Sequence, residues 1–175
     1  ATMPPTRFVA RCSCGQVEIE ADGPPIAHIS CYCDDCQRAA DIIDALPGGE
    51  SLRDADGGTP NLLFRKDRVR CTRGADLLDV HKVRDDTWTN RFVASCCNTA
   101  VMQRHDNWWP HQGIKPSLLT TAVPPIEFRI YTKYAPDLAA IPRDAIVSRT
   151  VSARFGLRLL RAAVALRFAR KRPER

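Results

Sequence analysis

Seven of the eight cysteines in this chain of 175 residues fall in three tight clusters, and this clustering limits how the chain can fold. The clusters are Cys12-Ser13-Cys14, Cys31-Tyr32-Cys33-Asp34-Asp35-Cys36 and Cys96-Cys97, while Cys71 stands alone. Disulfide frameworks of secreted domains join cysteines that are spread along the chain, and neighbours in a C-x-C pair are awkwardly placed to bond each other. Clustered thiols therefore favour metal binding.

The apolar content agrees with a globular domain. The hydrophobic fraction is 44%, which is enough for a buried core, and no uncharged apolar run approaches the roughly 18 residues of a membrane span. Residues 1–10 lack the apolar segment of a secretory signal. We therefore expect the chain to stay in the cytosol.

The net charge of +6 is confined to one end of the chain. From Val147 onward there are nine basic residues and one acid, which leaves 17 basic and 19 acidic residues before it. A nucleic-acid-binding domain needs a basic face on its body, and this body carries a net charge of −2. No nucleic acid is therefore expected for the body.

Short alternating runs predict a mainly β body made of antiparallel strands. In residues 16–21 the apolar Val17, Ile19 and Ala21 alternate with polar residues, which is typical of a half-buried strand. No long helical pattern separates the runs, which argues against a doubly wound α/β sheet. The further predicted strands are Arg7–Arg11, Ile26–Cys31, Leu62–Arg65, Arg68–Thr72, Leu77–Val83, Asn90–Ala94 and Ile126–Tyr131.

Residues 149–170 have a different pattern, which predicts an amphipathic helix. Val151, Phe155 and Leu159 share one face at 100° per residue, and arginines form a separate stripe. We predict a zinc-binding β domain over residues 1–134 and a linker with a basic helical tail over 135–175. We expect the apolar face of the tail to pack against the body or against a second copy of the chain. The alternatives are contact with a membrane surface or a protein partner and, less favoured, with nucleic acid.

The first and last cysteine clusters fit one closed zinc site. Structural zinc takes four ligands in a tetrahedron, and rigid turns present them in pairs. Gly15 can adopt positive φ after Cys12-Ser13-Cys14, and Asn98 is the non-glycine residue that best tolerates the same conformation after Cys96-Cys97. We predict a structural zinc on Cys12, Cys14, Cys96 and Cys97. The alternative is that Cys96 and Cys97 are merely small buried residues.

The middle cluster supplies three thiolates within six residues. Cys31 and Cys33 point the same way in an extended segment, and a turn brings Cys36 to the same ion. Three protein ligands leave one coordination position open, as in catalytic zinc sites. The alternative is that Cys71 closes the site, although a core-facing strand cysteine is the simpler account of that residue.

A zinc ion with three thiolates has a formal charge of −1, which suits it to deprotonating a thiol better than to activating water. The bound thiolate can attack an aldehyde carbon, and the reverse reaction releases the aldehyde. A proton donor would be needed, but none of the four histidines stands out, and Trp108-Trp109 form either a pocket wall or packing. The histidines are His28, His81, His105 and His111.

Three motifs in order resemble those of the glutathione-dependent formaldehyde-activating enzymes and their relative centromere protein V. They are Cys12-Ser13-Cys14-Gly15 before a strand, the run from Cys31 to Cys36 that continues to Arg38, and Arg91-Phe92 leading to Cys97-Asn98-Thr99. The resemblance covers roughly residues 8–131. It departs from the family where the usual C-x-x-C-G is replaced by Cys96-Cys97-Asn98, so Cys96 fits only through a local rearrangement.

The resemblance implies a zinc-bound β-tent fold with two zinc ions per chain. It implies carbon–sulfur lyase chemistry like that of S-(hydroxymethyl)glutathione synthase, with glutathione as the thiol, formaldehyde as the aldehyde and Cys31, Cys33 and Cys36 at the catalytic zinc. Arg38 would bind a glutathione carboxylate, although its i, i+4 spacing from Asp34 also fits a surface ion pair. The alternative function is a non-catalytic zinc module whose basic helix binds a partner, membrane surface or nucleic acid.

Overall fold

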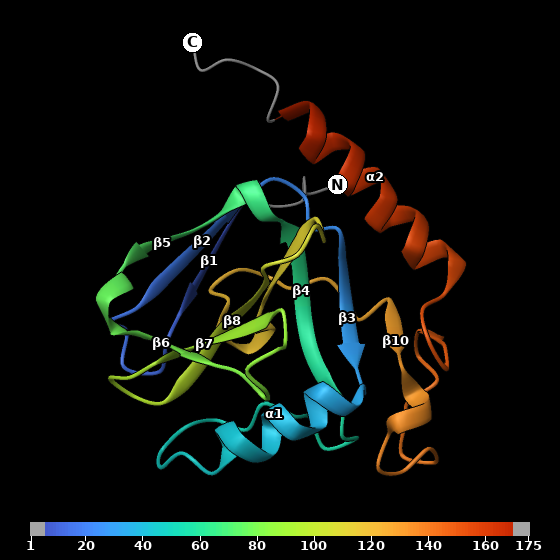
Figure 1. Cartoon of the computed structure of the whole chain (residues 1–175), viewed down its shortest axis with the longest axis horizontal. Coiled ribbons are helices and arrows are strands. Elements are labelled where there is room, and N and C mark those ends of the chain that lie inside the picture. Colours follow the sequence, from blue (N-terminus) through green and yellow to red (C-terminus); the bar gives the residue numbers. More distant parts are fainter. Residues whose placement is uncertain (1–5, 170–175) are drawn as a thin grey trace.

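The computed structural model describes residues 6–169, and it confirms a mainly β fold with a helix at the C-terminal side (Figure 1). Two helices accompany the sheets within these residues, α1 at Asp34–Asp44 and α2 at Ala153–Ala169. The strands are β1 Arg7–Arg11, β2 Glu18–Asp22, β3 Ala27–Cys31, β4 Thr59–Arg65, β5 Val69–Arg73, β6 Leu78–His81, β7 Thr89–Ala94, β8 Thr99–His105, β9 His111–Ile114, β10 Phe128–Ile130 and β11 Ile146–Val147.

The strands form two sheets of unequal size. The small sheet has the order β1-β2-β5, and the large sheet has the order β11-β10-β3-β4-β9-β8-β7-β6. Most pairs are antiparallel, as predicted, but β10 runs parallel to both β3 and β11. Long connections make the parallel pairs possible, because the chain passes through residues 115–127 before β10 and through residues 131–145 before β11.

The large sheet buries apolar side chains on both faces. On β4, Leu62 and Phe64 point to the core shared with the small sheet, whereas Leu63 points to the core that contains Phe155 of α2. On β7, Phe92 joins the first core and Val93 packs with Ile43 of α1. The alternation of side chains along each strand therefore places both helices on the face opposite the small sheet.

Helix α1 is longer than the short turn that the sequence analysis allowed. Asp34 and Asp35 occupy its first turn, where acidic side chains favour the helix dipole. Ala40 and Ile43 are among its buried residues and lie on one face at helical spacing. This face packs against the large sheet, where Ile43 contacts the cluster that contains Val93, and the helix begins at Asp34, shortly after the end of β3.

The segment between β10 and α2 is attached to the large sheet. Phe128 of β10 pairs with Ile146 of β11, and Arg129 forms an ion pair with Asp144 at 2.9 Å. The predicted division at residue 134 stays a prediction. The predicted helix over 149–170 begins later, at Ala153, and its final predicted residue lies outside the described range. No helix within residues 6–169 is both long and apolar enough to cross a bilayer.

Candidate metal centres and a cavity

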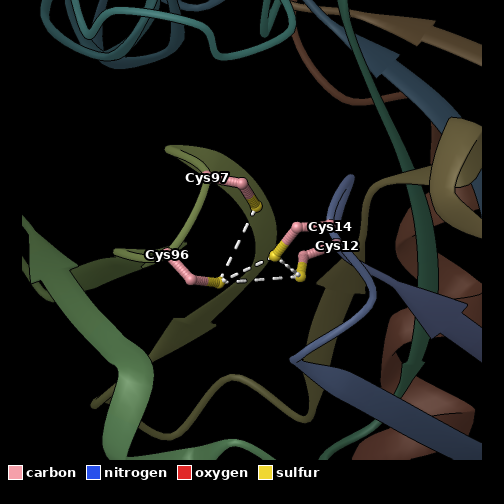
Figure 2. A group of neighbouring side chains, drawn as sticks. All are labelled: Cys12, Cys14, Cys96 and Cys97. Carbon is pink, nitrogen blue, oxygen red and sulfur yellow. Dashed lines mark hydrogen bonds between the residues drawn. The ribbon is translucent and has the colours of Figure 1, made fainter.

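The four-cysteine group, Cys12, Cys14, Cys96 and Cys97, forms where two turns meet (Figure 2). The first turn follows β1 and the second joins β7 to β8. Gly15 has φ +78° and Asn98 has φ +52°, so both turns use the left-handed backbone that the sequence predicted.

The four sulfurs lie within 4.8 Å of one another. The Sγ of Cys96 is 3.2 Å from that of Cys14 and 3.9 Å from those of Cys12 and Cys97. Tetrahedral zinc with Zn–S distances of about 2.3 Å separates its sulfurs by about 3.8 Å. The donor set therefore fits a tetrahedral thiolate site, and Cys96 takes part despite its displaced position in the motif.

Polar groups from both turns support this group. The backbone N–H of Val17 donates to the Sγ of Cys12 at 3.2 Å, and the Thr99 hydroxyl lies 3.1 Å from the Sγ of Cys97. Burial raises the pKa of Cys97, but the hydrogen bond with the Thr99 hydroxyl and further hydrogen bonds outweigh burial and lower this pKa to about 6. Burial and the contact with Cys14 raise the pKa of Cys96. Four thiolates this close together would need a cation to offset their mutual repulsion.

The three-cysteine group, Cys31, Cys33 and Cys36, lies at the junction of β3 and α1. Cys31 ends the strand, Cys33 is the N-cap of the helix, and Cys36 lies in its first turn. The sulfurs lie within 4.8 Å of one another, and Cys31 and Cys36 are buried while Cys33 is half-buried. Adjacent strand and helix ends thus bring three ligands together without a distant partner.

The thiols of this group share their protons. Contacts with Cys31 and Cys36 lower the pKa of Cys33 to about 3, whereas contacts with Cys33 and Cys36, followed by burial, raise the pKa of Cys31. The contact with Cys31 lowers the pKa of Cys36, but Cys33 and burial outweigh it and raise that pKa to about 12. Without a metal, one negative charge is shared among three sulfurs, two of which are buried. Three thiolates would need a divalent cation.

A cavity of about 250 Å³ opens beside the three-cysteine group. Its polar side is formed by β7, β8 and β9 of the large sheet, and its apolar side by α2 together with β3 and β10 of the same sheet. The polar lining includes Thr89, Arg91, Gln103, His105 and His111, and the apolar lining includes Ile29, Ile130, Val151, Phe155 and Leu159.

The strand register gathers the polar side of the cavity. Thr89 pairs with His105 and Arg91 pairs with Gln103, so all four side chains leave the same face of β7 and β8. The imidazole of His111, on β9, lies 5.0 Å from that of His105. These residues come from three strands and meet only in the sheet.

Several of these polar groups are buried. The Nη1 atom of Arg91 and the Nδ1 atom of His111 have no hydrogen-bond partner among the described residues. The Thr89 hydroxyl lies 2.9 Å from Nδ1 of His105. Burial lowers the pKa of His105 to about 4 and that of His111 to about 3, so both imidazoles are neutral at pH 7.

A buried network lies behind the three-cysteine group. Arg129 donates to the Tyr32 hydroxyl at 2.8 Å and to the Asp56 carboxylate at 2.8 Å, and Tyr32 donates to the same carboxylate at 3.0 Å. Tyr32 is fully buried between Cys31 and Cys33 in the chain. The network therefore fixes the backbone that carries both sulfurs.

Two residues singled out from the sequence lie away from the cavity lining. Arg38 is exposed and forms an ion pair with Asp34 at 3.2 Å, which is the alternative that their spacing allowed. Its proposed contact with a carboxylate stays a prediction. Cys71 lies on β5, packs against the core beside the small sheet and belongs to neither cysteine group. Trp109 lines the cavity, whereas Trp108 is highly exposed.

Much of the polar cavity lining has no clear signal in the sequence. His105 and His111 are two of four histidines that no motif distinguishes, and no alternating pattern predicts β8 or β9. Thr89 and Gln103 carried no motif. The sequence signal that was available is the alternation along β7: Phe92 points to the first core, so its neighbour Arg91 points to the other face of the sheet.

The fold and both cysteine groups define a mainly β protein whose thiols can hold metal ions. Residues 7–45 match the family model of the glutathione-dependent formaldehyde-activating enzyme. This segment contains Cys12, Cys14 and the three-cysteine group, and the match confirms the resemblance there. A solved structure of a Rhodobacter sphaeroides protein is 20% identical, with 66% of this chain and 91% of that chain covered and a TM-score of 0.46. No curated protein matches this chain significantly.

Proposed function

We propose that this protein is a zinc-dependent carbon–sulfur lyase that acts on the adduct of a glutathione-type thiol with a small aldehyde. One observation carries the proposal: the three-cysteine group has no fourth protein ligand among residues 6–169 and borders a cavity of about 250 Å³. A closed structural site would have a fourth protein ligand instead of an open coordination position beside the cavity. The match of residues 7–45 to the formaldehyde-activating family supports the same chemistry.

Two zinc ions per chain are part of the proposal. Cys12, Cys14, Cys96 and Cys97 would hold the structural ion, and the three-cysteine group would hold the catalytic one. When bound, the second ion would supply an acceptor for a fourth sulfur, which favours the thiolate form of the substrate. The cytosol, where thiols stay reduced, is the compartment that suits this ligand set.

The reaction joins a thiol sulfur to an aldehyde carbon. The new carbon–sulfur bond forms as the electron pair of the carbonyl moves onto oxygen, and this oxygen takes the proton that the thiol has lost. The reverse reaction returns the proton and releases the aldehyde. The free Nη1 of Arg91 and a neutral imidazole of His105 or His111 are suitable hydrogen-bond donors to that oxygen, because they line the cavity beside the sulfurs.

Metal content and thiol response test this proposal. We expect two zinc ions per chain after purification under reducing conditions, and turnover of S-hydroxymethylglutathione that Cys33→Ser abolishes. Cys71→Ser is the matched control because Cys71 lies outside both groups. Cobalt substitution should give a spectrum that changes when glutathione is added. A metal-free protein, or a spectrum unaffected by glutathione, would contradict the proposal.

A second candidate function is that of a zinc module which binds an anionic membrane surface through α2. The observation that favours it is a stripe of exposed apolar side chains opposite the buried face of the helix, with Phe168 66% exposed and Leu160 60% exposed. We call it the exposed stripe; it comprises Leu157, Leu160, Val164 and Phe168. Exposed Arg154, Arg161 and Arg167 flank it, as in interfacial helices.

Vesicle sedimentation tests the second candidate. We expect the protein to sediment with phosphatidylserine vesicles and Phe168→Glu to abolish this binding. Ile42→Glu is the control, because it adds the same charge at an exposed apolar position on α1. Equal sedimentation of all three proteins, or none, would remove the membrane role. Binding to nucleic acid or to a protein partner instead of vesicles would give the exposed stripe a role in that interaction and contradict the membrane role.

A further inference from the structure

Helix α2 forms a wall of the cavity beside the three-cysteine group. Val151 precedes the helix, and Phe155 and Leu159 lie one turn apart on its inner face; all three line the cavity. Phe155 packs on Phe128 of β10 with ring centroids 5.3 Å apart. The inner face of the helix is therefore part of the candidate active site.

Arg158 holds this wall in place. Its guanidinium forms an ion pair with Glu127 at 2.7 Å and also donates to the carbonyl of Ile26 at 3.1 Å. The same guanidinium lies over the ring of Phe128 at 5.1 Å. Three contacts from one side chain fix the rotation of α2, so that Phe155 and Leu159 face the sulfurs rather than solvent.

The wall has more apolar surface than a one-carbon substrate can cover. Ile29 and Ile130 extend it along β3 and β10. Formaldehyde contributes a single carbon to its glutathione adduct, and the remainder of that adduct is a charged peptide. Apart from the three-cysteine group, the charged side chains that line the cavity among residues 6–169 are Arg91 and Asp35, and Asp35 forms an ion pair with Arg84 at 2.8 Å. The lining thus offers one free cationic group, Arg91, to a peptide with two carboxylates, and a broader apolar surface to a hydrocarbon group.

We propose that the cavity takes thiol adducts in which the aldehyde-derived carbon carries an alkyl or aryl group, and that this group lies against Val151, Phe155 and Leu159. The inference rests on the proposed function for its chemistry and adds the substrate class. Longer apolar aldehydes would then be better substrates than formaldehyde, because each methylene that leaves water for the wall contributes to binding.

Binding of S-methyl-, S-butyl- and S-hexylglutathione, measured by calorimetry, tests the inference without turnover. These compounds keep the peptide constant and vary only the apolar group. We expect affinity to rise by up to about fourfold for each buried methylene. Leu159→Ala should reduce this rise, and Leu160→Ala should leave it unchanged, because Leu160 lies on the solvent side of the same helix. Val151→Ala, at an exposed position, repeats the test if Leu159→Ala lowers stability.

The outcomes separate this inference from the proposed function. Affinities that do not change with chain length, or a rise that both leucine variants reduce equally, would overturn the apolar site. Turnover of hydroxymethylglutathione together with constant affinities would leave the proposed function standing and remove only the substrate class. Affinity that rises with the length of the S-alkyl group, without turnover of any hydroxyalkyl adduct, would support the apolar site and contradict the lyase chemistry.

Discussion

The two cysteine groups use the same ligand atom in different surroundings. The four-cysteine group joins turns that are about 80 residues apart in the chain, and every sulfur has another sulfur within 4 Å. The three-cysteine group comes from six consecutive residues, is more deeply buried and borders a cavity. A metal site that links distant segments would contribute to folding, whereas a local site beside a cavity would leave a bound ion accessible to a small molecule.

The largest expected effect is a loss of stability from the four-cysteine group. Cys14 is exposed, so Cys14→Ser removes a ligand without leaving a core cavity. We expect the free energy of unfolding to fall by more than about 4 kcal/mol, because metal binding is part of the folding free energy of such a site. Thermal and urea denaturation measure this change, with Cys71→Ser as the control. A melting temperature equal to that of the wild type would show that the four-cysteine group does not stabilise the fold.

The three-cysteine group should respond in the opposite way. Cys33 is half-buried beside the cavity, and we expect Cys33→Ser to lower turnover at least about 100-fold and to reduce bound zinc from two ions to one. Stability should change much less than in Cys14→Ser. Turnover, metal analysis and denaturation of the two variants side by side check this. Unfolding as severe as that of Cys14→Ser would assign a structural role to both groups.

Acid should affect the cavity through its histidines. Burial lowers the pKa of His111 to about 3, below the unfolded value near 6.5, so the unfolded chain binds more protons as the pH falls. Stability is therefore full above pH 6.5 and is lost as the pH falls toward 3. The loss from His111 between pH 7 and pH 5 is about 2 kcal/mol.

Comparison of wild type with His111→Gln isolates this contribution from acid release of metal. We expect the variant to lose about 2 kcal/mol less than the wild type between pH 7 and pH 5, measured by urea denaturation. Phe92→Leu, which changes the core on the other face of β7, serves as a control with an unaltered pH dependence. Parallel pH profiles for wild type and His111→Gln would show that the cysteine groups alone account for the acid sensitivity.

The smallest effect is expected at Arg38. Its ion pair with Asp34 is exposed, with both side chains 55% accessible, so Arg38→Ala should change the free energy of unfolding by less than about 0.5 kcal/mol. Turnover and KM for glutathione adducts should stay close to those of the wild type. A raised KM with unchanged stability would establish Arg38 as a carboxylate ligand and would extend the three-cysteine site beyond its cavity.

Motif spacing predicted the ligand groups better than the architecture around them. Gly15 and Asn98 indicated the two turns because few residue types tolerate positive φ. The alternation of apolar and polar residues predicted strands such as Arg7–Arg11. Strand β8 was missed because Thr99–His105 mixes apolar and polar residues irregularly, and α1 was underestimated because its apolar face is short.

The sequence by itself determined the local cysteine groupings, since a C-x-C turn and a six-residue run bring sulfurs together through local backbone geometry. The meeting of the two cysteine pairs in the four-cysteine group, by contrast, depends on the tertiary structure. The sequence also determined the C-terminal helix through its 3.6-residue period. Only the tertiary structure decided what surrounds the sulfurs. Arg91, His105 and His111 reach the cavity through cross-strand register, and Phe155 reaches it because α2 packs on β10. Such contacts depend on pairings between distant segments, which no local pattern specifies.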